Sequence, residues 1–136
     1  MAEAVFMDKL RRAGLVGQIA VDSCGTAGWH AGELPHPGAQ RVLTAHNVAW
    51  NHRARQLDQA DLSADYLIAM DGDNLAEIHK LGVPTGEVGL LLDYSPNSGL
   101  RDVPDPYYTD RFEETYALIE AACDQLLATI RQRTGL

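Results

Sequence analysis

The string from Asp105 to Tyr108 holds the residue types best suited to chemistry in this sequence. Asp105 stands between Pro104 and Pro106, which keep the backbone extended or in a turn. A carboxylate on such a stiff loop could act as a general acid if partial burial raised its pKa from about 3.9. Tyr107 and Tyr108 could form the walls of a pocket for an aromatic ring, but a proline-rich turn whose tyrosines pack on the core explains them equally well.

A basic segment at residues 52–56 stands out because the chain has a formal net charge of −8. Its cationic side chains belong to His52, Arg53 and Arg55, and they could orient or neutralise an anion. A solvated surface run is the more common explanation for such a segment. Trp29, in a glycine-rich stretch, could form another pocket wall or anchor its loop.

The 5 histidines and 2 cysteines lack the paired spacing typical of metal ligands, so we expect no metal and no cofactor. A cysteine-dependent phosphatase needs a thiolate at the start of an anion-binding loop and an arginine six positions later. His30 stands six positions after Cys24, and Thr129 stands six positions after Cys123. Neither cysteine fits that nucleophile, and packing is the expected role of both.

The elements that must position these residues are predicted by apolar periodicity. Short apolar runs predict strands at residues 18–24, 66–70 and 87–92. Helices are predicted at residues 1–13 and 39–47, from a cap at Asp71 to Leu81, and from Asp110 nearly to the end. This alternation predicts an α/β fold with a small parallel sheet flanked by helices. The long loops at residues 25–38 and 96–108 follow strands, so the site is expected at the carboxyl ends of the strands.

The two terminal helices differ in how they begin. Asp110 and Glu113 are predicted to form a capping box at the start of the last helix. The first helix includes Met1 and has no preceding Ser, Thr, Asp or Asn that could cap it. This helix is therefore expected either to fray or to be preceded by further residues.

Length and composition limit the classes of protein that remain. The chain has 136 residues, which suits a single domain over residues 1–136, and 46% of them are hydrophobic, as in a soluble globular protein. Its 19 acidic and 11 basic residues disfavour nucleic acid and anionic membranes as partners. No apolar run approaches the roughly 20 residues of a membrane span, and no signal peptide is recognisable. Two cysteines are too few for a disulfide scaffold, so the cytoplasm is the expected location.

Taken together, several strings resemble the low-molecular-weight protein-tyrosine phosphatases. They occur in the family's order and spacing over nearly the whole chain, at residues 1–6, 21–26, 29–30, 52–56, 69–71 and 102–108, followed by 112–114. The resemblance implies a phosphotyrosine phosphatase I-like fold with a four-stranded parallel sheet. It also implies metal-free hydrolysis of a phosphotyrosine protein or an aryl phosphate through a cysteinyl-phosphate intermediate.

The resemblance also assigns roles to individual residues. Asp105 matches the general acid, which protonates the leaving phenolate and later activates water. Trp29, Tyr107 and Tyr108 match the walls of the pocket for the aromatic ring. Ser23 and His52 match positions whose hydrogen bonds brace the phosphate-binding loop.

One part of the family pattern is expected to be missing. In the family, a first strand and a loop of the form C-x-G-N-x-C-R-S-P precede the segment equivalent to Met1, and this loop supplies the nucleophilic cysteine and the arginine. The chain therefore resembles an N-terminally truncated phosphatase, and we expect no measurable activity from it, since losing a nucleophile costs about 10⁶-fold. The missing inner strand would lie between residues 18–24 and 66–70, leaving a gap of about 9.5 Å. Poor folding, or recruitment of a strand from elsewhere, is expected.

Three interpretations remain open. The first is a true phosphatase whose start codon was assigned too late. The second is a non-catalytic, phosphatase-like remnant that binds a partner protein. The third is a thiol-dependent arsenate reductase, but that chemistry needs further cysteines in the mid-chain loops, and residues 72–108 contain none.

Overall fold

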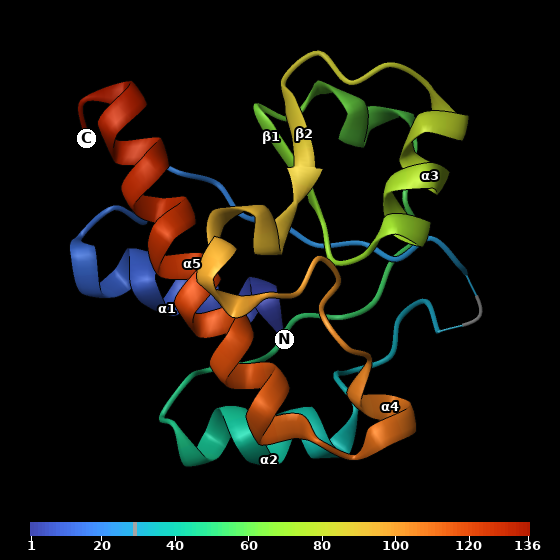
Figure 1. Ribbon diagram of the computed structural model, residues 1–136, viewed down its shortest axis with the longest axis vertical. Helices are drawn as coiled ribbons and strands as arrows, with labels where there is room; N and C mark the ends of the chain where they lie inside the picture. Colours follow the sequence, from blue (N-terminus) through green and yellow to red (C-terminus); the bar gives the residue numbers. More distant parts are fainter. Residues whose placement is uncertain (29) are drawn as a thin grey trace.

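The computed structural model describes residues 1–28 and 30–136, apart from the side chain of Tyr108. In that part of the chain, two of the three predicted strands form, and they alternate with helices (Figure 1). The strands are β1 (Tyr66–Ala69) and β2 (Glu87–Leu90), and the helices are α1 (Ala2–Ala13), α2 (Pro37–Ala45), α3 (Gly72–Leu81), α4 (Pro106–Thr109) and α5 (Phe112–Thr134). Short 3₁₀ helices lie at Gln59–Ser63, Leu91–Tyr94 and Pro96–Ser98.

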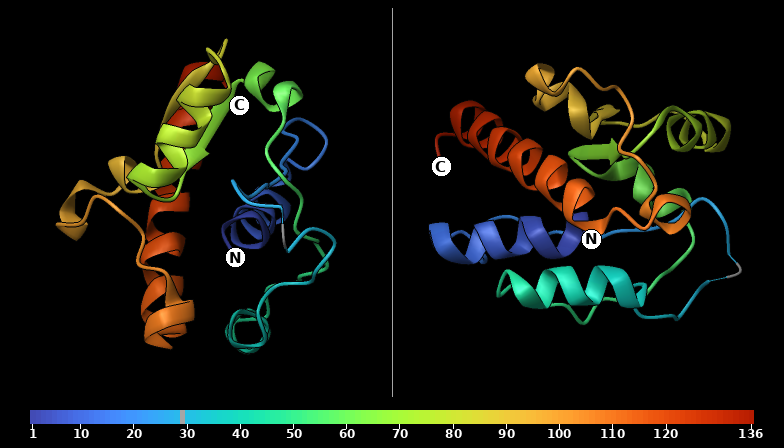
Figure 2. Two further views of the ribbon diagram at one scale, coloured as in Figure 1. Left: turned by 90° about the vertical axis from the view of Figure 1, so that its right-hand side faces the viewer. Right: turned by 60° about the horizontal axis from the view of Figure 1, so that its bottom comes forward.

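β1 and β2 form a parallel pair whose register runs from Tyr66 opposite Glu87 to Ala69 opposite Leu90. Helix α3 connects the two strands, and it lies on the opposite side of the pair from α5 (Figure 1, Figure 2). Such a connection is what a parallel pair requires, because its strands cannot be joined by a tight hairpin. The predicted α/β fold with a small parallel sheet flanked by helices is confirmed.

The alternation of side chains along β1 divides the core into two parts. Tyr66 and Ile68 pack against the larger cluster, which α1 and α5 dominate, whereas Leu67 and Ala69 pack against the smaller cluster around α3. Successive side chains of a strand point to opposite faces, so one strand can serve both clusters. The centre of the larger cluster includes Leu10 of α1, whose side chain is fully buried.

The strand predicted at residues 18–24 is not formed, and this prediction was wrong. The segment has no strand assignment, and the bridge that the described residues form next to it is an isolated parallel one between Gly25 and Gln56. Alternating apolar residues favour an extended backbone, but a strand also requires a hydrogen-bonded neighbour. Across from residues 18–24 there is a cavity instead of a strand.

Two helix starts differ from their predictions. Helix α2 begins at Pro37, two residues early, because proline suits the first helical position and His36 Nδ1 accepts a hydrogen bond from the Gly38 N–H at 3.0 Å. The capping box predicted at Asp110 and Glu113 is absent. Asp110 has the left-handed backbone of a helix C-cap, with φ of 58°, and terminates α4.

The start of α1 lacks a capping side chain, as predicted. Met1 occupies the N-cap position without a side-chain hydrogen bond. Burial lowers the pKa of its α-ammonium group, because the charged form loses hydration. Among the described residues, no helix is long and apolar enough to span a bilayer.

Replacing Gly38 by Ala is expected to lower the free energy of unfolding by about 1–3 kcal/mol, the usual cost of overpacking. A Cβ atom at Gly38 would overlap the ring of Phe112, where α2 packs against α5. Urea unfolding measures the change. The control is Gly17→Ala, whose Cβ meets nothing within 4 Å and should stay within about 0.5 kcal/mol of the parent. Equal effects of the two substitutions would contradict this packing.

Candidate active site

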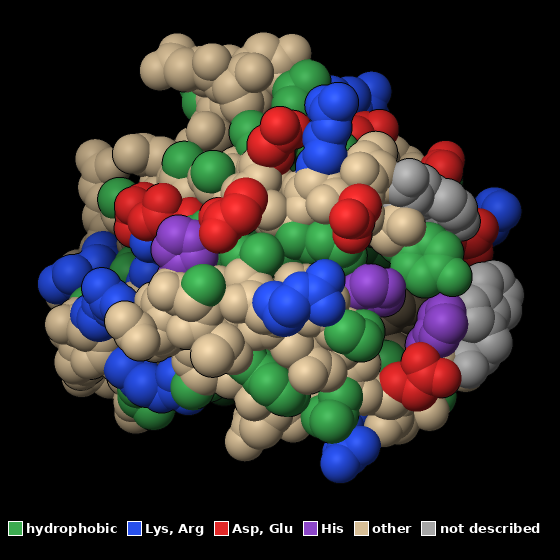
Figure 3. All heavy atoms as spheres, turned by 90° about the horizontal axis from the view of Figure 1, so that it is seen from below, with side chains coloured by type: hydrophobic (Ala, Val, Ile, Leu, Met, Phe, Trp, Pro, Cys, Tyr) green, Lys and Arg blue, Asp and Glu red, His purple; other side chains and the backbone are tan. Residues whose placement is uncertain are grey.

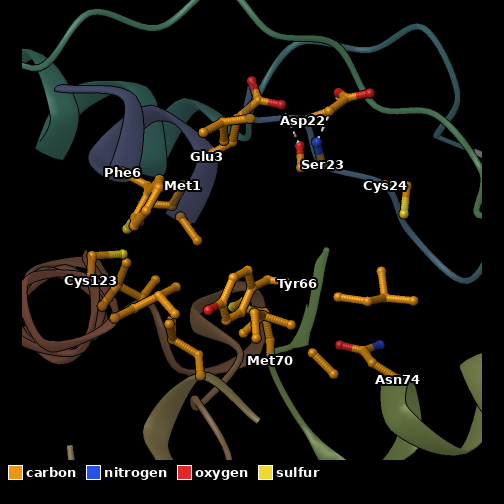
Figure 4. Close-up of a pocket in the computed structure, with 18 of the residues that line it drawn as sticks. Met1, Glu3, Phe6, Asp22, Ser23, Cys24, Tyr66, Met70, Asn74 and Cys123 are labelled. Atoms are coloured by element: carbon orange, nitrogen blue, oxygen red, sulfur yellow. Dashed lines mark hydrogen bonds between the residues drawn. The ribbon is translucent and has the colours of Figure 1, made fainter. Parts of the chain in front are cut away.

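The candidate site lies on a cavity of about 1430 Å³ between residues 18–24 and β1. Figure 4 shows Asp22, Ser23 and Cys24 on one side of this cavity and Tyr66 and Met70 on the other. The loop that follows β2 and the start of α1 also contribute to its walls. Segments that are far apart in the sequence therefore meet at one opening.

Glu3, in the first turn of α1, organises one wall of the cavity. The Ser23 hydroxyl donates to Glu3 Oε1 at 2.9 Å, and the other carboxylate oxygen lies 3.6 Å from His52 Nδ1 (Figure 4 shows the serine contact). An acidic side chain at this position also interacts favourably with the positive end of the helix dipole. The structure thus brings together Ser23 and His52, the two residues that the family resemblance assigns to bracing the phosphate-binding loop.

Two opposing influences act on the protonation of His52. Its side chain is largely buried, and the loss of hydration lowers its pKa below the ordinary value. The nearby α-ammonium group of Met1 lowers the pKa further, whereas the carboxylate of Glu3 raises it. Burial prevails, so the neutral imidazole is favoured at physiological pH.

The loop that carries Asp105 is fixed at both ends. The Val103 N–H donates to the Met70 carbonyl oxygen at 2.9 Å, which holds the loop against the residue that follows β1. The buried hydroxyl of Thr115, on α5, donates to the Pro104 carbonyl oxygen at 3.4 Å. This anchoring places Asp105 at the cavity wall, at the carboxyl end of β1, where the sequence predicted the site.

Asp105 acts as the N-cap of α4. Its Oδ1 accepts a hydrogen bond from the Tyr107 N–H at 2.9 Å. The side chain is exposed, so the partial burial that was expected to favour a protonated acid is absent in this structure.

Tyr107 lies beside Asp105 and is 65% exposed. Its ring meets the ring of His36 edge-on at 5.6 Å, and His36 in turn stacks on Phe112 at 5.1 Å. The tyrosine is thus supported on one side while its ring remains accessible to an aromatic ligand. The remaining predicted pocket walls, Trp29 and the side chain of Tyr108, lie outside the described residues.

The basic segment is used in internal contacts. Arg55 makes two hydrogen bonds to the carboxylate of Asp61, at 2.6 and 3.0 Å, and also contacts Asp22. Arg53 donates to the Gly32 carbonyl oxygen at 3.0 Å. These contacts hold the loop after residues 18–24 in place, so the suggestion that Arg53 and Arg55 orient an anion is not supported by this arrangement.

The two cysteines are unsuited to act as nucleophiles. Burial, together with the carboxylate of Asp61, raises the pKa of Cys24 to about 11. Burial among α1 and α5 raises the pKa of Cys123 to about 12. The reactive form of cysteine is the thiolate, which is scarce at both positions at neutral pH. Within the described ranges, no three His, Cys, Asp or Glu side chains converge in a way that could hold a metal.

Three organising residues were missed from the sequence: Glu3, His36 and Asp61. Glu3 and His36 act through partners distant in the chain, Ser23 and Phe112, whereas Asp61 holds Arg55, six residues earlier. The position of Glu3 could have been noticed in the sequence, because an acidic side chain in the first turn of a helix that lacks a capping residue interacts favourably with the helix dipole. Asp61 also carried a local signal, because it follows Asp58 by three residues and completes a capping box with it.

The cavity, the acid-bearing loop and the accessible tyrosine suit a hydrolase that acts on an aromatic ester. The family of low molecular weight phosphotyrosine protein phosphatases matches residues 1–135. The chain belongs to this family, whose members are hydrolases.

Individual relatives agree with this assignment. The low molecular weight protein-tyrosine-phosphatase YfkJ of Bacillus subtilis is 44% identical over 140 residues, covering 100% of this chain and 90% of that protein. Low molecular weight protein-tyrosine phosphatase A of Mycobacterium tuberculosis is 39% identical over 137 residues, covering 98% of this chain and 84% of that protein.

Solved structures resemble the fold closely. The crystal structure of YfkJ from Bacillus subtilis matches with a TM-score of 0.93 at 43% identity, covering 98% of this chain and 86% of that one. A Drosophila arginine phosphatase matches with a TM-score of 0.87 at 28% identity, covering 96% of this chain and 88% of that one. The similar folds therefore include a relative whose name specifies a different phosphorylated residue.

Replacing Glu3 by Gln is expected to lower the pKa of His52 further, because the carboxylate that favours the imidazolium is removed. NMR titration of the His52 ring measures this pKa. The control is Glu33→Gln, which removes a carboxylate that contacts His30 and should leave His52 unchanged. A rise in the His52 pKa after Glu3→Gln would contradict the arrangement.

Replacing Asp61 by Asn is expected to cost about 1.5–3 kcal/mol of stability at pH 7, the range for hydrogen bonds to charged groups. Arg55 lowers the pKa of Asp61 in the folded state. The stabilisation is therefore present above the unfolded value of about 3.9 and is lost as pH falls through the folded value.

Urea unfolding between pH 2 and 7 should accordingly show a smaller acid-induced loss of stability in Asp61→Asn than in the parent. Asp65→Asn, at an exposed carboxylate nearby, is the control and should keep the parent's pH dependence. A parent-like pH dependence in Asp61→Asn would contradict the role of the pair.

Proposed function

We propose that this protein is a protein-tyrosine phosphatase in which Asp105 is the general acid. The carboxylic acid gives its proton to the phenolate oxygen as the phosphorus–oxygen bond breaks and the phosphoryl group passes to a cysteine sulfur. The resulting carboxylate then takes a proton from the water that hydrolyses the cysteinyl phosphate. Trp29, Tyr107 and Tyr108 contact the aromatic ring of the substrate, and no metal or other cofactor takes part.

One observation carries the proposal. In a chain matched to the family over residues 1–135, Asp105 lies on the cavity wall directly beside an accessible tyrosine. A proton donor next to an aromatic surface suits an aryl phosphate, whose leaving group is a phenolate. The contacts of Ser23 and His52 with Glu3 support the proposal that these two residues brace the phosphate-binding loop.

We further propose that residues 1–136 do not supply the nucleophile. The raised pKa values of Cys24 and Cys123 support this proposal, as does the engagement of Arg55 by two aspartates. General acid catalysis contributes about 10²–10⁴-fold, which cannot compensate for a missing covalent step. A reducing compartment such as the cytoplasm suits a protein whose two cysteines are unpaired.

The test compares residues 1–136 with a chimera in which a strand and a C-x-G-N-x-C-R-S-P loop of the family are fused before Met1. Residues 1–136 alone should release no phosphate from phosphotyrosine peptides above buffer, and the chimera should turn over. Turnover by residues 1–136 alone would refute the missing nucleophile. A folded chimera that is inactive, or that hydrolyses phosphoarginine in preference to phosphotyrosine, would refute the proposed function.

In the chimera, Asp105→Asn is expected to lower kcat for phosphotyrosine by about 10²–10⁴-fold. The loss should be smaller for an aryl phosphate with an acidic phenol, because that leaving group needs less protonation. The matched control is Asp110→Asn, an exposed carboxylate on the same loop whose left-handed backbone asparagine tolerates. Equal losses for both leaving groups would contradict the acid role of Asp105.

The alternative is a non-catalytic remnant that binds a partner protein. Its distinguishing result is saturable binding of a phosphotyrosine peptide by residues 1–136, with Tyr107→Ala weakening it, together with an inactive chimera. The scarce thiolate at both cysteines is the observation that keeps this alternative in view.

A further inference from the structure

We propose that His36 is a positioning residue, whose ring holds Tyr107 in the orientation in which that tyrosine contacts the aromatic ring of the substrate. His36 acts through Tyr107 and touches no reacting group. The inference rests on the proposed function, because it concerns how well the aryl part of a phosphate ester is bound. The family resemblance assigns no role to His36.

The first argument is a column of three aromatic rings that leads from the core to the cavity wall. Phe112, at the start of α5, is 6% exposed and belongs to a buried cluster. The ring of His36 stacks on it at 5.1 Å with an angle of 18° between the planes, and Tyr107 meets His36 edge-on at 5.6 Å and 85°. Aromatic pairs favour these two arrangements. The exposed tyrosine is therefore connected to the core through His36.

The second argument is that the first turn of α2 fixes the ring of His36. The Nδ1 atom accepts a hydrogen bond from the Gly38 N–H at 3.0 Å, which is the contact of a helix N-cap. Gly38 also leaves room for the ring of Phe112, which a Cβ atom at this position would overlap. The imidazole is thus held from the helix on one side and from the buried ring on the other, before any ligand arrives.

The third argument is the exposure of Tyr107. Its helix, α4, has only four residues, and its side chain is 65% exposed. The Tyr107 N–H donates to Asp105 Oδ1, which fixes the backbone but not the ring. An exposed side chain loses rotamer freedom when a ligand packs on it, and this loss weakens binding. A neighbour that orders the ring in advance reduces the loss, so His36 should strengthen binding of an aryl group.

Histidine suits this position because one side chain performs both tasks. Asparagine caps a helix equally well but has no ring, whereas phenylalanine has a ring but offers no acceptor for the Gly38 N–H. Figure 3, which views the molecule from the side on which α2 lies, shows histidine side chains at the surface beside hydrophobic ones. Two substitutions at His36 can therefore separate the contribution of the ring from that of the cap.

The test measures kcat and KM of the chimera for a phosphotyrosine peptide and Ki for inorganic phosphate, which has no aryl group. His36→Asn should raise KM about 3–10-fold, the effect of losing one aromatic pair, and leave kcat and the phosphate Ki unchanged. His36→Phe should restore the parent KM, although the lost cap lowers Tm. The matched control is His79→Asn, at an exposed position on α3, which should leave all these values unchanged.

Three kinetic results would overturn the inference: an unchanged KM in His36→Asn, an equal rise in KM and in the phosphate Ki, or an equal rise in KM in His36→Phe. NMR relaxation of the Tyr107 ring in residues 1–136 needs no turnover. The ring should be more mobile in His36→Asn than in the parent or in His36→Phe. An inactive chimera refutes the proposed function, and ring mobility then decides the inference, which equal mobility in the three proteins overturns.

Discussion

The pairing of backbone N–H and C=O groups is the constraint on which the rest of this structure depends. β1 satisfies it on one side through β2, whereas residues 18–24 satisfy it hardly at all. A cavity of about 1430 Å³ lies between them, and apolar side chains from both sides line it. Ile68 and Val21, which line this cavity, are half-buried.

Helices α1 and α5 pack together beside this cavity. α1 and α5 pack through Leu10 and Cys123, and Lys9 bridges the helices through Glu120 and Asp124 at 2.9 and 2.6 Å. A carboxylate on α1 then holds a loop against these helices, because Glu3 accepts a hydrogen bond from Ser23. These contacts explain how the acid-bearing loop and the bracing residues keep a common arrangement around an opening.

The site could be predicted from the sequence only in part. Asp105 and Tyr107 were recognisable because prolines and adjacent tyrosines form an unusual local string, and their cavity position agrees with the rule for parallel sheets. The exposure of Asp105 and the contact of Arg55 with Asp22 were not predictable, because burial and this ion pair depend on residues distant in the chain. The strand at residues 18–24 was predicted wrongly for the same reason.

The sequence by itself determined the alternation of helices and strands, the cap at Asp71, the uncapped start of α1 and the family to which the chain belongs. These features depend on local periodicity, on capping chemistry and on short strings of residues. The tertiary structure alone decided that residues 18–24 form no strand and that Glu3 joins Ser23 to His52. Both depend on which segments become neighbours, and a strand or a buried carboxylate is stable only when that neighbour supplies its hydrogen bonds.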